Sequence, residues 1–184
     1  MTPHGESIGF GRPYTRTDLL MLPEDGRRPE VIDGVLIVTP SPTLAHQDAV
    51  FELAMLLHDA CPEEWEAVLG PIAVVLAEDT ELRPDVVVAR RDDWTAEYLP
   101  GPPELAVEVQ MPCTEVIDNV LKRKRHERAG TRAYWVFDPE KRRLIVWERG
   151  PRGSYRKVAN ATGPQRFETK VPYPVSVVPA DLVA

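Results

Sequence analysis

Short apolar runs separated by proline and glycine dominate the pattern of the chain and predict several buried strands. The two clearest are 82–89 and 104–110, which are rich in valine, leucine and alanine. Runs of this kind are typical of strands inside a sheet. Each contains a carboxylate, Asp85 in the first and Glu108 in the second, and a charge within a buried strand is costly unless a cation or hydrogen-bond donors compensate it. The two acids therefore indicate a metal-ion site on adjacent strands.

Two local patterns predict the elements at the start of the chain. Residues 15–22 have the spacing of a short helix, with Thr15 as its N-cap and Asp18 completing a pair that is typical of a capping box. Residues 30–39 have the pattern of a β-hairpin around Asp33-Gly34, a dipeptide that favours a tight hairpin turn. We therefore expect a helix followed by a β-hairpin.

Helical spacing also predicts two longer helices. Apolar residues recur every three or four positions over 44–60, and Ser41 or Thr43 can cap this helix. A second long helix is expected from 114 to 129, and Gly130 is placed to end it in the left-handed conformation. The apolar side of this second helix is Ile117, Val120 and Leu121, whereas a separate face repeats every four residues at Asp118, Lys122 and His126.

The remaining apolar runs complete a mixed α/β fold. Further strands are expected within 66–77, at 133–137, in a hairpin of 141–148 with 155–158, and at 175–178, with an acidic turn at 78–81 and a polar loop at 90–103. This order predicts a mixed sheet with helices packed on it. At 184 residues the chain suits one domain, which we assign to residues 14–184 after a flexible arm at 1–13.

Composition and charge narrow the classes of protein. A net charge of -7 argues against a sequence-blind nucleic-acid coat, although residues 122–132 hold six basic residues and one acidic residue. No apolar stretch is long enough for a membrane span and the start has no hydrophobic signal region. Two widely separated cysteines fit a reducing cytoplasm, and Cys113 reads as a buried small side chain rather than a nucleophile. Exposed strand edges and an apolar hairpin at 144–147 are compatible with a homodimer.

Several polar residues interrupt otherwise apolar segments and are candidates for chemistry: Glu30, His46, Asp85, Glu108, Gln110 and Lys122. Oxygen-rich clusters select hard cations such as Mg²⁺ or Mn²⁺. Asp85, Glu108 and the carbonyl of Val109 could supply the oxygens. Lys122 would then orient or deprotonate a water molecule, or neutralise charge that develops on a phosphoryl oxygen.

Each of these residues also has a simpler structural explanation. Asp85 follows a proline and could cap a turn, and Glu108 could lie on a solvated face of its strand. Lys122 belongs to a basic run of the kind that usually forms a solvated helix face, and His46 could hydrogen-bond the backbone at the start of its helix. Taken singly, none of the signals decides between structure and chemistry.

The order and spacing of the motifs resemble one known family. The segments are Glu30-Val-Ile-Asp-Gly-Val-Leu36, Pro40-Ser-Pro42 with His46, Arg83-Pro-Asp-Val-Val-Val88, Val107-Glu-Val-Gln-Met-Pro-Cys-Thr114, Lys122, and Gly130-Thr-Arg-Ala-Tyr-Trp-Val-Phe-Asp-Pro139. From about residue 14 to 182 the chain resembles the Uma family of putative restriction endonucleases, in the PD-(D/E)XK nuclease superfamily. The resemblance implies a restriction-endonuclease-like mixed central sheet flanked by helices, with extra antiparallel hairpins and the active site on a strand hairpin.

The resemblance also implies roles for individual residues. Asp85 and Glu108 would be the metal-binding acids and Glu30 a further acid. Many superfamily members have a lysine two residues after the second acid, where this chain has Gln110, so the resemblance suggests that Lys122 from the next helix replaces it. The chain departs from the family at Met111-Pro-Cys-Thr114, where Ser-Pro-Ser-Thr is usual, and at His126, where a tyrosine is common. Both departures concern hydrogen bonds near the site.

These observations lead to a principal hypothesis and two alternatives. The principal one is a Mg²⁺-dependent nuclease that hydrolyses phosphodiester bonds, with DNA as the first candidate substrate, Gln110 and His46 orienting water or phosphate, and Arg123, Arg125 and Arg128 following the phosphates. The first alternative is a non-catalytic binding or dimerisation module with the same fold, which the acidity and the displaced lysine favour. A hydrolase of another phosphate ester would use the same residues.

Overall fold

The computed structural model describes residues 11–23 and 26–183, and the larger of its sheets contains both strands that carry the predicted acids. This sheet has six strands in the order β11-β10-β9-β8-β6-β3. Their bounds are β3 Trp65–Leu69, β6 Val86–Arg90, β8 Leu105–Val109, β9 Ala133–Asp138, β10 Arg143–Arg149 and β11 Tyr155–Thr162. β8 and β9 are parallel and the other neighbours are antiparallel, so the sheet is mixed as predicted.

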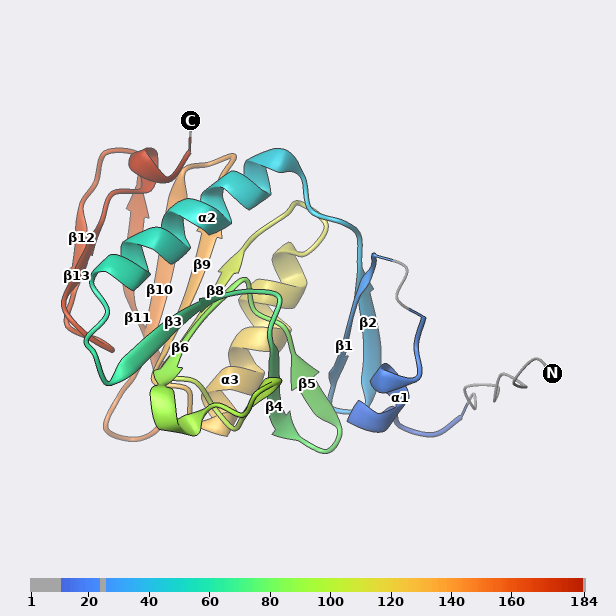
Figure 1. Ribbon diagram of the computed structural model, residues 1–184. Helices are drawn as coiled ribbons and strands as arrows, with labels where there is room; N and C mark the ends of the chain where they lie inside the picture. The colour runs from blue at the N-terminus through green and yellow to red at the C-terminus, as the bar shows by residue number, and fades with distance from the viewer. Residues whose placement is uncertain (1–10, 24–25, 184) are drawn as a thin grey trace.

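A second sheet of five strands, in the order β2-β1-β5-β4-β7, lies beside the first (Figure 1). Its strands are β1 Arg28–Ile32, β2 Val35–Thr39, β4 Ala73–Ala77, β5 Thr80–Leu82 and β7 Tyr98–Pro100. A pair of short strands, β12 Phe167–Thr169 and β13 Val175–Val177, forms a third, small sheet. The helical segments are α1 Arg16–Leu20, α2 Leu44–Asp59, η1 Arg91–Asp93, η2 Ile117–Lys122, α3 Arg123–Ala129 and η3 Pro179–Leu182.

The long helix α2 and the η2–α3 segment cover opposite faces of the six-stranded sheet. Successive side chains of a strand point to opposite faces. Val107 and Trp135 accordingly pack in one core with Leu53 of α2, whereas Ala106 and Tyr134 belong to a second cluster. Tyr134 contacts the η2–α3 side, because its hydroxyl donates to a backbone carbonyl of η2 at 2.8 Å. In Figure 1, α2 crosses in front of the sheet.

The two strands that carry the predicted acids are antiparallel neighbours in the middle of this sheet. Val86 lies opposite Val107, and the backbone N–H of Asp85 donates to the Val107 carbonyl at 3.0 Å. Asp85 therefore stands at the entry to β6 and beside the strand that holds Glu108. The predicted adjacency of the two strands is confirmed.

Local signals placed several boundaries correctly. Thr15 and Asp18 form the capping box of α1, and the Thr43 hydroxyl accepts from the His46 N–H at 3.3 Å at the start of α2. Asp33 and Gly34 both have positive φ, 49° and 77°, as the tight turn between β1 and β2 requires. Gly130 is left-handed with φ 102° and ends α3.

The helix predicted over 114–129 forms, but its buried side is the polar one. Asp118, Lys122 and His126 are buried, whereas Val120 and Leu121 are 37% and 45% exposed. The segment begins as a π-helix, η2, and continues as α3. The apolar residues do form one side of the helix, as predicted, but this side faces solvent. The polar side faces inward, because its side chains form ion pairs and hydrogen bonds beneath the helix.

Two predicted loops contain regular structure. The acidic turn at 78–81 overlaps strand β5, where Glu81 is buried because Arg16 and Arg83 both pair with its carboxylate. The polar loop at 90–103 contains η1 and the short strand β7, which pairs in parallel with β4. The acidic run in the first segment and the polar, proline-rich composition of the second favoured loops, since paired carboxylates and short edge strands do not show in the hydrophobic pattern.

The expectation that Cys113 is buried was wrong, and the apolar hairpin considered for a homodimer is not exposed. Cys113 is exposed rather than buried, because it lies in the turn before η2. The apolar hairpin residues 144–147 are buried, because β10 lies between β9 and β11 and both of its faces are covered. These four residues therefore offer no open surface for a homodimer.

Two expectations concern the ends of the chain and membranes. Most of the arm predicted at 1–13 lies outside the described residues, and within the described part Arg12 pairs with Asp18. Across residues 11–23 and 26–183, no helix has the length and apolar character that crossing a membrane requires.

Candidate active site

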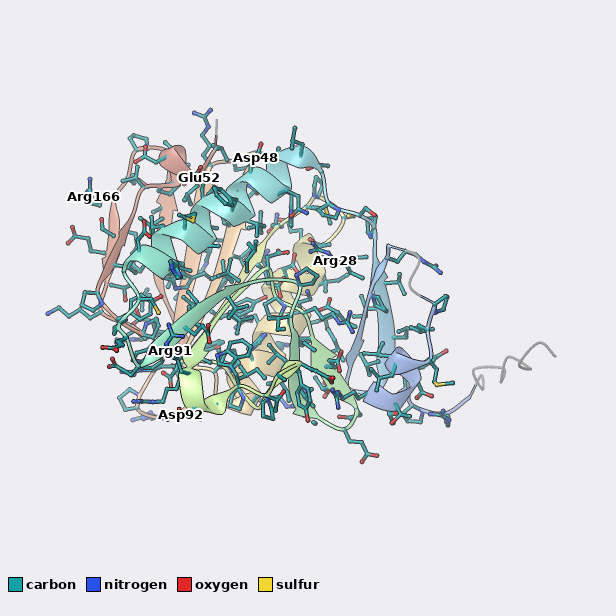
Figure 2. The ribbon with its side chains drawn as sticks, viewed as in Figure 1. Arg28, Asp48, Glu52, Arg91, Asp92 and Arg166 are labelled. Carbon is teal, nitrogen blue, oxygen red and sulfur yellow. The ribbon has the colours of Figure 1, made fainter. Side chains whose placement is uncertain are left out.

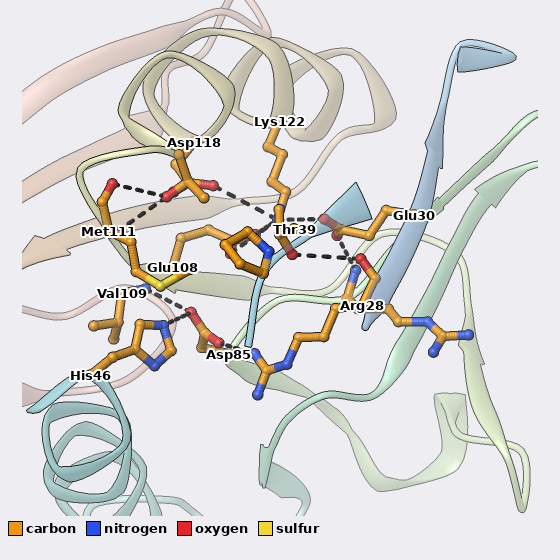
Figure 3. Close-up of a pocket in the computed structure, with 13 residues that line it drawn as sticks. Arg28, Glu30, Thr39, His46, Asp85, Glu108, Val109, Met111, Asp118 and Lys122 are labelled. Atoms are coloured by element: carbon orange, nitrogen blue, oxygen red, sulfur yellow. Dashed lines mark hydrogen bonds and ion pairs between the residues drawn. The ribbon is translucent and has the colours of Figure 1, made fainter. Parts of the chain in front are cut away.

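A small cavity at the junction of the two sheets gathers most of the predicted site residues. It has a volume of about 30 Å³, enough for roughly one water molecule or ion. We refer to it as the acidic cavity. Its lining, most of which is labelled in Figure 3, is Arg28, Glu30, Thr39, Pro40, His46, Arg83, Asp85, Glu108, Val109, Met111, Thr114, Asp118 and Lys122.

Asp85 is held at this cavity by three donors. Its Oδ2 accepts from the backbone N–H of Val109 at 2.9 Å and lies 3.3 Å from His46 Nε2, and its Oδ1 lies 2.9 Å from Arg28 Nη1. Burial by itself raises the pKa of Asp85, but the hydrogen bond and charge of His46, the Val109 N–H and the charge of Lys122 together bring the pKa below its ordinary value. Asp85 is therefore an ionised carboxylate.

The backbone under Asp85 leaves room only for glycine at position 70. The Gly70 N–H donates to the Asp85 carbonyl at 2.7 Å. A Cβ at this position would lie 2.2 Å from the carbonyl oxygen of Pro84 and 2.9 Å from that of Asp85. Because glycine allows the end of β3 to pack closely against the start of β6, this contact fixes the position of Asp85 relative to the cavity.

The carbonyl of Val109 points toward the same edge of β8 as the Val109 N–H. Within a strand, the N–H and C=O of one residue point toward the same neighbour. Because the Val109 N–H donates to Asp85 and Val109 lines the acidic cavity, its carbonyl is directed to the Asp85 side of β8. This agrees with its predicted place beside the two acids.

Lys122 reaches into the cavity from η2 and meets three carboxylates. Its Nζ lies 2.8 Å from Glu30 Oε2, 3.2 Å from Glu108 Oε1 and 3.7 Å from Asp118 Oδ1. Burial lowers the pKa of Lys122, but the charges of these three acids outweigh it and hold the pKa well above the ordinary value. Lys122 is an ammonium ion whose charge is shared by three acids.

This cluster is short of positive charge. Burial is the main cause that raises the pKa of Glu108 well above its usual range and the pKa of Asp118 to about 6, and the charge of Lys122 only partly opposes it. Glu108 Oε1 is buried and accepts no well-directed hydrogen bond within the described part of the chain. A further cation beside Glu108 would relieve the charge imbalance and give Oε1 a second charged partner besides Lys122 Nζ.

The donors present suit a hard divalent cation. Asp85, Glu108 and the Val109 carbonyl supply oxygen only, which is the donor type that Mg²⁺ and Mn²⁺ prefer. Among residues 11–23 and 26–183, no three His, Cys, Asp or Glu side chains converge into a ready-made metal cage. Any such ion would therefore be held by two carboxylates, a backbone carbonyl and water, as is usual for Mg²⁺.

Gln110 lies outside the acidic cavity. Its amide donates to Asp138 Oδ2 at 3.4 Å and accepts from the Asn119 side chain at 2.6 Å. These contacts tie β8 to β9 and to η2, the segment that carries Lys122. The structure thus brings six of the seven predicted residues, Glu30, His46, Asp85, Glu108, Val109 and Lys122, to one cavity and leaves the seventh behind it.

The predicted phosphate-tracking arginines point elsewhere. Arg125 and Arg128 both pair with Asp33 at 3.2 Å, and Arg123 stacks over Trp147. The arginines that line the acidic cavity are Arg28 and Arg83 instead.

Among the cavity residues that were not predicted, Arg28 and Asp118 each had a signal in the sequence. Arg28 precedes Glu30 by two positions on a strand, so their side chains share a face. Asp118 precedes Lys122 by four positions on a helix and shares its face in the same way. Strand alternation and helix spacing could have added both residues to the predicted site.

The mixed sheets, flanking helices and antiparallel hairpins are the fold expected of a restriction-endonuclease-like protein. Residues 16–176 match the model of the Uma2 family, described as putative restriction endonuclease. The chain belongs to the Uma2 family, and the predicted membership is confirmed.

A solved structure has the same fold. The crystal structure of a putative nuclease belonging to DUF820 from Anabaena variabilis ATCC 29413 superposes with a TM-score of 0.68. It shares 22% sequence identity, and the match covers 92% of this chain and 97% of the other. No curated protein matches the sequence.

Proposed function

We propose that this protein is a divalent-cation-dependent nuclease that hydrolyses phosphodiester bonds in nucleic acid, with DNA as the first candidate. The observation that carries the proposal is the position of Lys122, whose Nζ lies 3.2 Å from Glu108 although it comes from the following helix. It supplies the ammonium that Gln110 cannot supply. Membership of a nuclease family supports the same reaction.

In this proposal Asp85, Glu108 and the Val109 carbonyl hold Mg²⁺ or Mn²⁺. The ion would supply a water molecule of lowered pKa and positive charge for the phosphate oxygens. Lys122 is placed as a donor to the attacking water or the phosphate, because its Nζ lies at the cavity beside Glu30 and Glu108. Its N–H groups orient the attacking water or stabilise charge that develops on the phosphoryl oxygen.

Glu30 and His46 position the reacting groups. Glu30 Oε1 accepts the backbone N–H of Arg83 at 2.6 Å while its Oε2 binds Lys122, so it fixes the ammonium relative to β1. His46 holds Asp85 Oδ2 from the first turn of α2, and its Nδ1 is buried without a hydrogen-bond partner in the described structure. That free nitrogen suits the predicted role of orienting a water molecule or phosphate.

Cleavage assays test the proposal. Plasmid DNA, single-stranded DNA and RNA are incubated with Mg²⁺ or Mn²⁺ and either the wild type or Asp85→Ala. Asp48→Ala is the matched control, since Asp48 lies on the exposed side of α2 (Figure 2). We expect cleavage that Asp85→Ala abolishes and Asp48→Ala preserves. No cleavage of any substrate, or cleavage unchanged in Asp85→Ala, contradicts the proposal.

A non-catalytic module with the same fold is the second candidate. The net charge of -7 and the pairing of Arg125 and Arg128 with Asp33 favour it, because both reduce the positive surface available to phosphates. Thermal unfolding with and without Mn²⁺ separates the two candidates. A cation site gains stability from the ion, whereas a module without one shows no shift.

The proposal also covers the cellular location of the protein and its assembly into a homodimer. Both cysteines are free thiols, which suits the cytoplasm. The edge strand β2 exposes Val35 and Val38, and this edge is where we place a homodimer contact. Analytical ultracentrifugation of the wild type and of Val38→Lys tests it: a dimer that Val38→Lys dissociates supports the contact, and a monomeric wild type contradicts it.

A further inference from the structure

Arg28 contacts the Asp85 oxygen that a bound cation would need. Asp85 Oδ2 already accepts from the Val109 N–H and lies within reach of His46, so Oδ1 is the oxygen left for another partner. That partner is Arg28 Nη1, at 2.9 Å (Figure 3). Arg28 uses one of the two lone pairs of Oδ1, so a metal ion bound through the other would sit directly beside the guanidinium on the same atom.

The competition is electrostatic as well as steric. A divalent ion bound to Asp85 would lie within a few ångströms of a guanidinium held on the same oxygen, where little water screens their repulsion. Lys122 is enclosed, with 5% of its side chain exposed, whereas 20% of the Arg28 side chain is exposed at the mouth of the cavity. Arg28 can therefore leave the carboxylate, and Lys122 cannot.

We propose that Arg28 is an exchangeable counter-ion of the site, which neutralises Asp85 before the cation binds and then contacts a non-bridging oxygen of the scissile phosphate. This inference rests on the proposed function and deepens it. A guanidinium presents several donors in a planar fork that matches phosphate oxygens, so it is suited to the second position as well as the first. The phosphate would then lie beside Arg28 at the mouth of the cavity, since the cavity itself has room for about one water molecule or ion.

Arg83 provides a matched comparison. It lines the same cavity and is 29% exposed, but its side chain pairs with Glu81 at 3.1 Å rather than with Asp85. Its removal takes a positive charge from the mouth without freeing Asp85 Oδ1. Comparing variants of the two arginines therefore distinguishes a general effect of positive charge from competition for Asp85 Oδ1.

Mn²⁺ titration by calorimetry without nucleic acid tests the exchange. The wild type, Arg28→Met and Arg83→Met are compared. Removing the competitor is expected to lower the Kd for Mn²⁺ in Arg28→Met on the order of tenfold, since about 1.4 kcal/mol corresponds to one factor of ten. Arg83→Met should stay within about twofold of the wild type. Arg28→Gln keeps a neutral donor and is expected to fall in between, which provides a second variant if Arg28→Met does not fold.

Cleavage at saturating Mn²⁺ tests the phosphate contact. Arg28→Met should bind the ion more tightly and yet cleave on the order of ten to a hundred times more slowly, because a transition-state donor is missing. Unchanged or weaker Mn²⁺ binding in both Arg28 variants overturns the exchange, and undiminished cleavage overturns the phosphate contact. In either case the proposed function stands if Asp85→Ala loses Mn²⁺ binding and cleavage. A wild type that binds no Mn²⁺ overturns both proposals.

Discussion

The Nζ of Lys122 lies 2.8 Å from Oε2 of Glu30 and thereby joins η2, on the six-stranded sheet, to β1 of the five-stranded sheet. The same ammonium contacts Glu108 on β8, so one side chain connects three elements that are far apart in the sequence. The stability of the junction and the geometry of the acidic cavity consequently depend on one buried positive charge.

Lys122→Met should destabilise the protein and abolish cleavage. The substitution keeps the aliphatic stem but leaves Glu30, Glu108 and Asp118 buried without their cation. Breaking a buried pair in this way costs about 3–5 kcal/mol. Urea unfolding at pH 7.5 measures the loss. Lys124→Met, at an exposed position of α3, should change stability by less than about 0.5 kcal/mol. Equal effects of the two substitutions would contradict the role given to Lys122.

Glu30→Gln should lower activity without lowering stability. The amide oxygen can still accept the Arg83 N–H, and the substitution removes one of the three acidic groups around a single ammonium. We expect a change in unfolding free energy between zero and about 1 kcal/mol of stabilisation, because a buried excess charge is relieved. Cleavage should fall because Lys122 loses its shortest contact. A strong destabilisation in urea would show that positive and negative charges in the cluster are balanced and that there is no excess of negative charge.

Asp118→Asn should flatten the dependence of stability on pH. The pKa of Asp118 is raised to about 6, chiefly by burial, so the folded chain binds this proton more tightly than the unfolded chain does. The contribution to stability is full below about pH 4 and is lost as pH rises through 6. Between pH 4 and pH 7.5, the free energy of unfolding of the wild type should therefore fall by up to about 3 kcal/mol more than that of Asp118→Asn.

Urea midpoints across this pH range provide the measurement for Asp118→Asn. Asp48→Asn is the control, since this exposed carboxyl on α2 should follow the wild-type curve. Parallel curves for wild type and Asp118→Asn would mean that the burial of Asp118 does not govern its titration.

Gly70→Ala should disturb Asp85 through the backbone. The added methyl group would lie 2.2 Å from the Pro84 carbonyl oxygen, and neither strand can move without shifting the entry to β6. We expect a destabilisation of about 1–3 kcal/mol together with weaker Mn²⁺ binding. Gly150→Ala is the control, because its Cβ would meet the Ser154 carbonyl only at 3.5 Å. Unaltered Mn²⁺ affinity in Gly70→Ala would argue that Asp85 is positioned by its side-chain partners alone.

Much of the fold could be predicted because its signals are local. The Asp33-Gly34 turn, the caps Thr15 and Thr43, and the left-handed Gly130 each depend on a few neighbouring residues. The valine-rich runs around Asp85 and Glu108 likewise identify two central strands by composition alone. In each case the backbone preference and the hydrophobic pattern agree.

The orientation of η2 could not be predicted in the same way. The amphipathic pattern favours Val120 and Leu121 as the inward side, and only the partners of Lys122 reverse it. Glu30 lies on another sheet, so its contact with Lys122 leaves no trace in the sequence around either residue. For the same reason Gln110, two residues after Glu108 in sequence, lies outside the acidic cavity, whereas Arg28 lines it.

The inverted face of η2 has a consequence for the order in which the chain folds. Val116, Val120 and Leu121 are the residues that early collapse would draw toward the sheet, yet in the native protein they face water. The polar side chains can turn inward only after β1 and β8 have brought Glu30 and Glu108 into place. We therefore expect η2 to dock after the transition state, so that Lys122→Met speeds unfolding and leaves the refolding rate nearly unchanged. The acidic cavity would be among the last features of the molecule to form and among the first to open.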